Sequence, residues 1–386
     1  MKLQAKWLFW GLALLVLACG KPPTFEVPET DGMRWFKGNT HTHTTNSDGD
    51  SPPEYVARWY KEHGYHFLVL SDHNVLTHPQ IVAHLVDSSF IAIPGEEVSS
   101  GFNKKPVHVN GLNISRLVEP RVDSSMVATI QANVDAVREA DGVPHINHPN
   151  FIWAFSHREL LQIRNDRLLE IYNGHPLVNN WGGGGWPGME QVWDHLLTAG
   201  KRIYGIAVDD AHDFQGEFSL RKANPGRGWV MVRAHNLDPL EIVQNLEKGL
   251  FYASTGVELE DVIVTPNRIE IRIRQRWDFK YRTQFIGDGG KVLFESQDNP
   301  AVFELNQRTS YVRAKVMSSG GFVAWCSRCL PNKHSSYKNL LELDWMNKIF
   351  RILDFKEKPC RTEQQPESFF FDICSVRIWE YKDGLI

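Results

Sequence analysis

Residues 34–48, RWFKGNTHTHTTNSD, set the architecture to expect from this chain. An aromatic run that suits a β-strand ends in His41 and His43, which one residue separates, and an acid follows at Asp48. Alternate side chains of an extended segment point to the same side, so both histidines can reach one ion. Imidazole nitrogen and carboxylate oxygen are natural ligands for zinc, manganese and iron. The stretch therefore predicts a strand that delivers metal ligands at its carboxyl end.

Short β-branched and aromatic runs alternate with longer amphipathic segments from Arg34 to Val208. The runs predict seven strands, near residues 34–40, 67–71, 90–94, 107–112, 142–147, 168–172 and 202–208. Three of the segments between them predict helices that end at a glycine or an Asp-Gly pair: Pro53–His63, Met126–Ala140 and Met189–Ala199. This alternation favours a parallel sheet or an α/β barrel.

Clusters of histidine and acid follow these strands in order. They are His41-Thr42-His43 with Asp48, Asp72-His73-Asn74, Glu96-Glu97, His108, His145 to His148, Glu170 with His175, and Asp209-Asp210-Ala211-His212. Sites in α/β barrels are built at the carboxyl ends of the strands. Each cluster alone carries little weight, but their joint occurrence at strand ends predicts a metal site. Two ions held close together activate water without a protein nucleophile, which suits a sequence that has no Gly-x-Ser-x-Gly motif.

Taken together, these motifs resemble those of the PHP (polymerase and histidinol phosphatase) metal-dependent phosphoesterases. The resemblance covers about residues 34–235 and rests on motifs that occur in order: His41-Thr42-His43 with Asp48, Ser71-Asp72-His73-Asn74, Pro94-Gly95-Glu96-Glu97, His108, Asn147-His148-Pro149 and Asp210-Ala211-His212. It implies an α/β fold, a distorted (β/α)7 barrel of PHP type, with two or three divalent ions (Zn, Mn or Fe). The order Gly38-Asn39-Thr40-His41 and the β-rich continuation are most similar to PHP-type lipoproteins.

The resemblance also implies which side chains hold each ion. One ion would be bound by His41, His43, Glu97 and Asp210. Glu97 would bridge to a second ion, bound by His108 and His148. A third ion would be bound by Asp48, His73 and His212. The family's acid stands two places after the glycine, which selects Glu97 over Glu96, and the Asp-x-His motif selects Asp210 over Asp209.

The chain divides by composition into five parts. Residues 1–18 are expected to be a lipoprotein signal peptide, residues 19–33 a tether and residues 34–235 the metallohydrolase barrel. Residues 236–326 predict a helix over Asp238–Lys248 and then a small antiparallel β-sandwich, because strict alternation and turn residues replace the earlier pattern. Residues 327–386 form a tail to which the pattern assigns no fold.

The N-terminal segment has the pattern of an export signal. Lys2 and Lys6 stand before an apolar run, Trp7–Ala18. This run is too short to span a bilayer and has the length of a signal-peptide core. The run ends at Cys19 in a segment that looks like a bacterial lipobox, in which the cysteine carries lipid. The alternative is an ordinary signal peptide with an incidental cysteine. The lipobox reading implies an exported protein, anchored by lipid to a membrane of the bacterial cell envelope.

The other four cysteines lie at positions 326, 329, 360 and 374. In an exported protein an even set of four suggests two disulfides, while Cys326-x-x-Cys329 leaves a zinc site as the alternative. The formal net charge of the chain is −4, and the sequence has no basic stripe. No nucleic-acid partner is therefore expected.

Several further residues are weaker candidates. His145 is either a substrate contact or partner to a ligand, or a buried structural histidine, and His175 could contact a substrate or a leaving group. A substrate anion could be met by Arg221, Lys222 and Arg227. The segment Trp181–Trp186 lacks the Gly-Lys-Ser/Thr of a nucleotide-binding loop and predicts a plain loop or a mobile lid.

The resemblance implies an exported hydrolase in which a metal-held hydroxide attacks a small-molecule phosphate ester. Hydrolysis of a carbamate or carboxylic ester by the same hydroxide is the first alternative. The second is a non-catalytic lipoprotein that binds metal or another ligand. The motifs leave the oligomeric state and the substrate open.

The lipid anchor has a direct test in Cys19→Ser. We expect this variant to leave the membrane fraction for the soluble exported fraction, or to stay unprocessed, because lipid supplies the hydrophobic attachment. Fractionation followed by immunoblotting measures the distribution. A processed Ser variant that still sediments with membranes would contradict the lipobox interpretation.

Overall fold

The computed structural model of the chain describes residues 24–305 and 309–329. The expected signal peptide, Cys19 and the tail from residue 330 onward lie outside these residues. Within the described ranges, no helix is long and apolar enough to cross a membrane.

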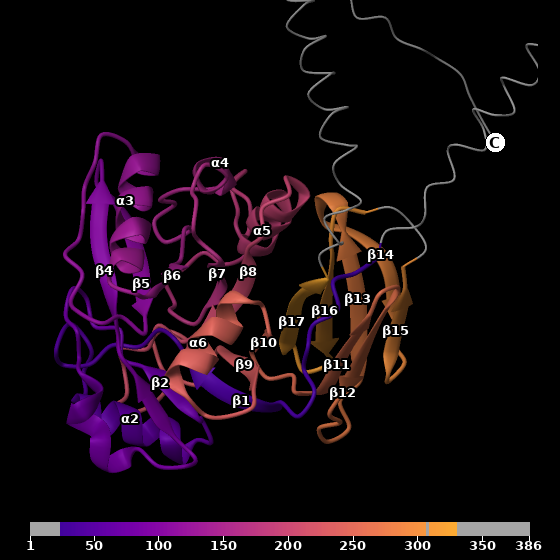
Figure 1. The fold of residues 1–386 in the computed structure, drawn as a ribbon, viewed down its shortest axis with the longest axis horizontal. Helices are drawn as coiled ribbons and strands as arrows, with labels where there is room; N and C mark the ends of the chain where they lie inside the picture. The colour runs from indigo at the N-terminus through magenta and orange to yellow at the C-terminus, as the bar shows by residue number, and fades with distance from the viewer. Residues whose placement is uncertain (1–23, 306–308, 330–386) are drawn as a thin grey trace, which may run out of the picture. The chain divides into compact units, whose positions relative to one another are not determined.

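Seventeen strands and five α-helices make up this part of the chain (Figure 1). The strands are β1 (Arg34–Asn39), β2 (Phe67–Val69), β3 (Ile91–Ile93), β4 (Gly95–Phe102), β5 (Lys105–Leu112), β6 (Val143–Ile146), β7 (Leu168–Asn173), β8 (Tyr204–Val208), β9 (Trp229–Ala234), β10 (Phe251–Ser254), β11 (Leu259–Thr265), β12 (Arg268–Ile273), β13 (Tyr281–Gly287), β14 (Lys291–Ser296), β15 (Ala301–Glu304), β16 (Val312–Ser318) and β17 (Val323–Cys329). The α-helices are α2 (Pro53–Glu62), α3 (Met126–Glu139), α4 (His157–Leu160), α5 (Met189–Thr198) and α6 (Pro239–Glu247). Two 3-10 helices are η1 (Pro79–Leu85) and η2 (Asp288–Gly290).

The four predicted helices and seven predicted strands are present, and their ends have local causes. Helix α3 begins after Ser125, whose hydroxyl accepts a hydrogen bond of 3.1 Å from the backbone N–H of Ala128. Helix α6 begins after Asp238, whose carboxylate accepts the N–H of Glu241 at 3.0 Å. Strand β4 lies within the segment expected to be a connection and was not predicted.

The strands form a mixed α/β fold with two large open sheets, so a closed (β/α)7 barrel is not confirmed. One sheet has the order β14-β13-β16-β17-β10-β9-β1-β2-β3, and the other has the order β4-β5-β6-β7-β8. The physical reason lies in two connections. Pro94 alone separates β3 from β4, and the left-handed residues Asn103 and Lys104 (φ 49° and 63°) turn β4 back into β5 as an antiparallel hairpin. Neither connection leaves room for a crossover helix, which a parallel barrel strand requires.

The two sheets meet where their strands end. Isolated bridges join Thr42, just past β1, to Ala211, just past β8, and join His73, after β2, to Glu97 in β4. Below these bridges one apolar core is shared by both sheets and by α6. It includes Val69, Ile93, Ile206, Val230 and Ile242, which are all buried. The shared core therefore fixes the strand ends that carry the predicted ligands.

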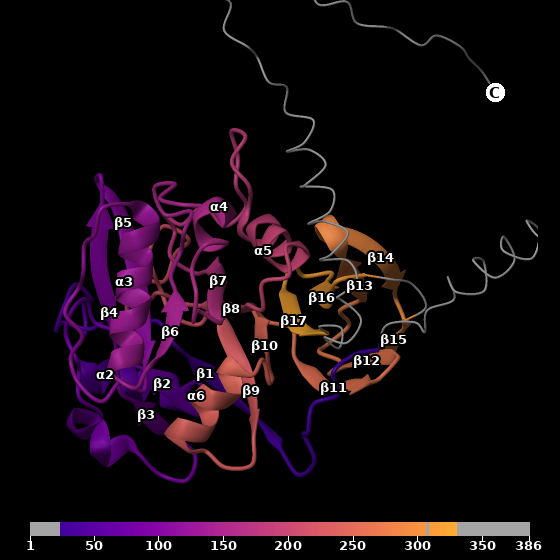
Figure 2. The same ribbon diagram turned by 45° about the horizontal axis from the view of Figure 1, so that its top comes forward.

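The C-terminal strands do not form a separate sandwich in the way that was expected. A three-stranded sheet, β11-β12-β15, packs across a second core that includes Ile271, Phe285 and Phe303. Its facing strands, however, belong to the nine-stranded sheet, because β17 pairs with β10 and β10 pairs with β9 (Figures 1 and 2). The domain boundary at residue 235 stays a prediction, since α6 and β10 beyond it pack on the earlier strands.

The predictions for the C-terminal cysteines concern side chains that lie largely outside the described residues. Cys326 in β17 is a buried free thiol, and its burial raises its pKa to about 12. The side chains of the other three C-terminal cysteines are not among those described. The choice between disulfides and zinc stays a prediction.

A buried ion pair joins α5 to β16. The guanidinium of Arg313 donates from Nε and Nη2 to the two carboxylate oxygens of Asp194, at 2.7 and 2.8 Å, and the hydroxyl of Tyr311 donates to the same carboxylate at 2.8 Å. Both charged side chains are almost fully buried. Removing one partner of such a pair leaves an uncompensated charge in the interior.

We therefore expect Asp194→Asn to lower the free energy of unfolding by about 3–5 kcal/mol. Chemical denaturation followed by circular dichroism measures it. The matched control is Glu54→Gln, which removes an exposed i,i+4 pair with Arg58 and should leave the midpoint nearly unchanged. Equal midpoints for the two variants would contradict the importance of the buried pair.

Candidate metal centre

Nine side chains converge at the carboxyl ends of β1, β2, β6 and β8 and on β4 and β5. They are the nine that the motifs selected, and they fall into four overlapping groups whose donor atoms lie within 4.8 Å of one another: His43, Asp48, His73 and His212; His41, His43 and Glu97; His41, His148 and Asp210; and His73, Glu97 and His108. Tertiary structure thus brings together residues that are separated by up to 171 positions from His41 to His212.

Three of the four donors implied for the first ion, His41, His43 and Glu97, form one of these groups, and Asp210 lies in another with His41 and His148. His41 Nε2 lies 3.1 Å from His43 Nε2 and 3.1 Å from Asp210 Oδ1, and His43 Nε2 lies 3.2 Å from the same oxygen. Glu97 Oε2 lies 3.4 Å from each of the two imidazole nitrogens. Ligand atoms at about 2.0–2.1 Å from a tetrahedral metal are separated from one another by about 3.3 Å. The spacing therefore fits a divalent ion.

The donors implied for the second ion, His108 and His148, lie at the other oxygen of Glu97. Glu97 Oε1 lies 2.9 Å from His108 Nδ1 and 3.2 Å from His148 Nε2. One carboxylate therefore presents its two oxygens to two separate sets of imidazoles. This is the arrangement that a bridging ligand between two cations requires.

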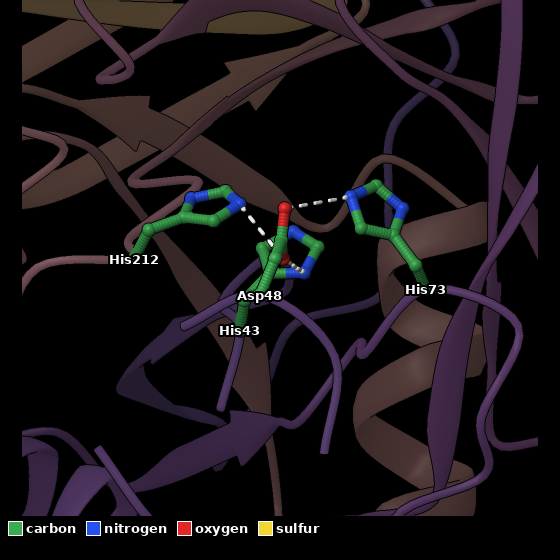
Figure 3. A group of neighbouring side chains, drawn as sticks. All are labelled: His43, Asp48, His73 and His212. Atoms are coloured by element: carbon green, nitrogen blue, oxygen red, sulfur yellow. Dashed lines mark ion pairs between the residues drawn. The ribbon is translucent and has the colours of Figure 1, made fainter. Parts of the chain in front are cut away.

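The donors implied for the third ion lie in the group around Asp48, whose carboxylate points toward the neighbouring rings in Figure 3. This carboxylate lies between the rings of His43, His73 and His212, at oxygen–nitrogen distances of 3.5, 3.5 and 3.2 Å. The side chain of Asp48 is 54% exposed, whereas that of Glu97 is 1% exposed. Asp48 therefore marks the open side of the centre.

The chemistry of the donors fits metal ions better than a network of ordinary hydrogen bonds. Glu97 Oε2 is buried and makes no hydrogen bond of ordinary geometry, although His73 Nδ1 lies 2.9 Å away, and the nitrogens of His41 and His43 face each other. Burial by itself would raise the pKa of Glu97, but the charges of His108, His41 and His73 lower this pKa well below its ordinary value. Burial and the charge of His212 lower the pKa of His43 to about 4. Against the opposing effect of burial, the neighbouring carboxylates raise the pKa of His41, His148 and His212, and they raise that of His73 to about 10. Because a metal binds neutral imidazole, a bound cation would displace these protons.

The backbone is strained at two of the nine positions. Asp210 has φ 50° and His148 has φ 21°, both on the left-handed side that non-glycine residues rarely adopt. Such conformations persist only where the surrounding structure holds them, and they gather at functional sites.

A second layer of polar groups orients the ligands, and its main member, Glu170, was not selected by the motifs. Glu170 Oε1 lies 2.6 Å from His41 Nδ1, and Glu170 Oε2 accepts the backbone N–H of His148 at 2.7 Å. Asn173 donates to Glu170 and, at 3.0 Å, to Asp210. Metal-binding histidines commonly use their second nitrogen on such a carboxylate. The available signal was the position of Glu170 near the end of a predicted strand.

The neighbouring acids have other partners. Glu96 accepts the N–H of Val118 at 2.8 Å, and burial raises its pKa to about 7. Asp209 accepts the backbone N–H groups of residues 226–228 and the hydroxyl of Tyr60. Both face away from the donor groups, so the structure places Glu97 and Asp210 in the centre, as the motifs selected.

The weaker candidate residues lie in different places relative to the centre. His145 is fully buried behind the centre, with Nε2 at 3.4 Å from Glu170 Oε1, so it stands beside the second layer of polar groups. His175 is partly exposed and its ring centre lies 5.4 Å from that of His212, at the rim. Arg227 donates to the carbonyls of Gly174 and Ser219 and holds the rim loops together. Lys222 donates to the carbonyl of Gln215 at 3.4 Å, and no hydrogen bond of Arg221 is seen among the described contacts.

The chain is similar to several solved structures. A two-domain protein from Bacteroides vulgatus that contains a predicted PHP-like metal-dependent phosphoesterase matches with 16% identity and a TM-score of 0.48, over 82% of this chain and 99% of that one. A protein from Bifidobacterium adolescentis, provisionally described as a metal-dependent phosphoesterase, matches with 14% identity and a TM-score of 0.35, over 52% and 91%. An amidohydrolase from Chromobacterium violaceum, with bound sulfate and no metal, matches with 15% identity and a TM-score of 0.34, over 48% and 93%.

Its structural neighbours thus include PHP-like metal-dependent phosphoesterases. No family model matches the sequence, and no curated protein matches it significantly.

Glu97→Gln tests the centre because it keeps the shape of the side chain and removes the charge that faces both groups. We expect loss of at least one ion and a fall in any hydrolytic turnover of about a hundredfold or more, because a neutral amide offsets the repulsion between two cations poorly. Elemental analysis and rate measurements check this, with circular dichroism as the folding control.

Glu96→Gln is the matched variant. It changes an adjacent acid of the same strand that faces Val118, so metal content and turnover should change little. A Glu96 variant that loses metal while the Glu97 variant keeps it would overturn the assignment of the bridging carboxylate.

Proposed function

We propose that this protein is a metal-dependent hydrolase of the PHP type that cleaves small-molecule phosphate esters. The observation that supports this most strongly is the convergence of nine donors around Glu97, whose two oxygens face two different sets of imidazoles. We further propose that the strand ends of the two open sheets correspond to a distorted (β/α)7 barrel whose hydrogen-bonded ladder is interrupted.

The residues of the chain have separable roles in this proposal. His41, His43, Glu97 and Asp210 would hold one divalent ion. His108 and His148, with Glu97, would hold a second ion. His73 and His212, with Asp48, would hold a third, and each ion would be Zn, Mn or Fe. When bound, such ions would activate a water molecule and stabilise the negative charge that develops on the phosphoryl oxygens.

The second layer and the rim complete the site. Glu170 fixes the ring of His41 and the backbone of His148, so the donor atoms keep their positions before substrate arrives. His175 accepts the backbone N–H of Leu177 on Nδ1, which leaves its Nε2 as the donor in the neutral ring. At the exposed rim it could donate a hydrogen bond to the leaving-group oxygen of an ester.

Two alternatives from the sequence remain part of the proposal. The same centre could hydrolyse a carbamate or carboxylic ester, since the activated water is the nucleophile in both cases. A non-catalytic metal-binding lipoprotein is disfavoured because no donor of the set is missing. Export and attachment to the cell envelope through lipid on Cys19 are proposed from the sequence alone.

The test is a comparison of substrate classes with the purified full-length chain. Metal content is measured by elemental analysis. Hydrolysis is then measured with phosphomonoesters, cyclic phosphates, phosphodiesters and aryl carbamates, before and after removal of metal with a chelator. We expect at least two ions per chain and turnover of one or more phosphate esters, lost on chelation and restored by Zn²⁺ or Mn²⁺.

Two results would contradict the proposal. Hydrolysis of aryl carbamates without any phosphate ester would assign the protein to the alternative class. Phosphate-ester hydrolysis that survives complete removal of metal and the Glu97→Gln change would show that the activity lies outside the centre.

A further inference from the structure

A second concave site lies beside the metal centre and contains none of its nine donors. A cavity of about 330 Å³ is enclosed by α5 and β7 on one side and by β13, β14, β16 and β17 on the other. Helix α5 lies beside these strands in both views of the fold (Figures 1 and 2). The volume of the cavity falls within the range of small-molecule sites, about 300–1,000 Å³.

The charged groups in its wall neutralise one another. Asp194 is held by Arg313 in the bidentate pair described above, and Glu190 lies 2.5 Å from Lys315 Nζ and 3.2 Å from Arg313 Nη2. Two cations thus face two anions, and Arg313 Nη1 is buried without a hydrogen-bond partner. A charged ligand would meet a wall group of its own sign beside each group of opposite sign, whereas a neutral hydroxyl could accept from Arg313 and leave both ion pairs intact.

The remaining wall combines one exposed aromatic side chain with side-chain amides. Trp181 lines the cavity with 71% of its surface exposed, whereas Trp325 is 1% exposed and packs against the partly buried ring of Tyr172, with ring centroids 6.0 Å apart. The amides of Gln191 and Gln284 also line the cavity. Gln191 Oε1 accepts the N–H of Gly188 at 2.9 Å and Gln284 Nε2 donates to Glu295 at 2.8 Å, so Gln191 Nε2 and Gln284 Oε1 are the atoms that a ligand would meet. An aromatic face packs against the C–H face of a ring compound, and amides both donate to and accept from hydroxyl groups.

The loop that carries Trp181 is shaped for this position. Gly182, Gly183, Gly184 and Gly185 have φ of 71°, 145°, 59° and 86°, so four successive residues adopt conformations that other residues rarely take. The base of the loop is anchored, because Trp186 Nε1 donates to Asn150 Oδ1 at 2.9 Å. The glycines therefore turn the chain so that Trp186 is fixed while Trp181 stays exposed beside the cavity.

From these observations we infer that the cavity binds a neutral saccharide, with Trp181 stacking on the sugar ring and the amides of Gln191 and Gln284 bonding its hydroxyls. The inference does not depend on the proposed hydrolysis. The site is connected to the centre, however: Asn180 lines the cavity and exchanges two hydrogen bonds with the backbone of Asn173, whose side chain donates to Asp210.

The test is calorimetric titration of the full-length protein with glucose, N-acetylglucosamine, maltose and cellobiose. We expect saturable binding of at least one of them with a dissociation constant of about 1–10 mM. Trp181→Ala should weaken it about tenfold, and Trp181→Phe, which keeps an aromatic face, should retain most of it. Trp277→Ala is the matched control: Trp277 is 74% exposed but does not line the cavity, so its loss should change the affinity by less than about twofold.

Charged sugars test whether the ligand has to be neutral. Glucosamine and glucuronate should show weaker Trp181-dependent binding than the neutral sugars, because each meets a wall group of its own sign. The inference is overturned if none of the neutral sugars binds saturably, if Trp181→Ala binds as well as the unchanged protein, or if a charged sugar binds best. None of these results would affect the metal content, so failure here is distinct from failure of the proposed function.

Discussion

The carboxylate of Glu97 is the group on which the arrangement of the site depends. It is almost completely buried, and taking a carboxylate out of water is costly unless positive charge or donors surround it. Here His41, His43, His73, His108 and His148 surround it at 2.9–3.4 Å. These imidazoles come from β1, β2, β5 and β6, so the carboxylate can be accommodated only when both sheets have formed. The centre and the fold are therefore mutually dependent.

The two open sheets hold their strand ends together without the continuous ring of hydrogen-bonded strands of a closed barrel. The bridges Thr42–Ala211 and His73–Glu97 join their strand ends beside the candidate ligands, while the rest of the two sheets remains separate. A shared apolar core beneath, with Val69 and Ile206 from opposite sheets, keeps the ends at a fixed distance. The ligand positions thus rest on packing that is remote from any ion.

Buried carboxylates also hold the loops that carry the ligands. Asp72 accepts the backbone N–H and the hydroxyl of Thr44 and the hydroxyls of Ser47 and Thr77, which fixes the loop before Asp48. Asp209 does the same for the loop at residues 226–228. Each stands next to a candidate ligand in the sequence. At each of these strand ends, one residue therefore accepts hydrogen bonds from a loop, and the next residue faces the candidate metal centre.

The sequence by itself determined the local elements and singled out the side chains that the structure brings together. Period-two and helical patterns are short-range, so the strands before and after His41 and the helices such as α3 could be predicted, and the motif His-x-His marks two side chains on one side of a strand.

Only the tertiary structure decided the rest. The hairpin that makes β4 antiparallel depends on Asn103 and Lys104 adopting positive φ, which their residue types permit but do not require. The role of Glu170 depends on a distance of 2.6 Å to a residue 129 positions away, and the continuity of the C-terminal strands with the first sheet depends on the pairing of β17 with β10. Long-range pairings of this kind leave no periodic trace in the chain, because they are selected by shape and charge after the local elements meet.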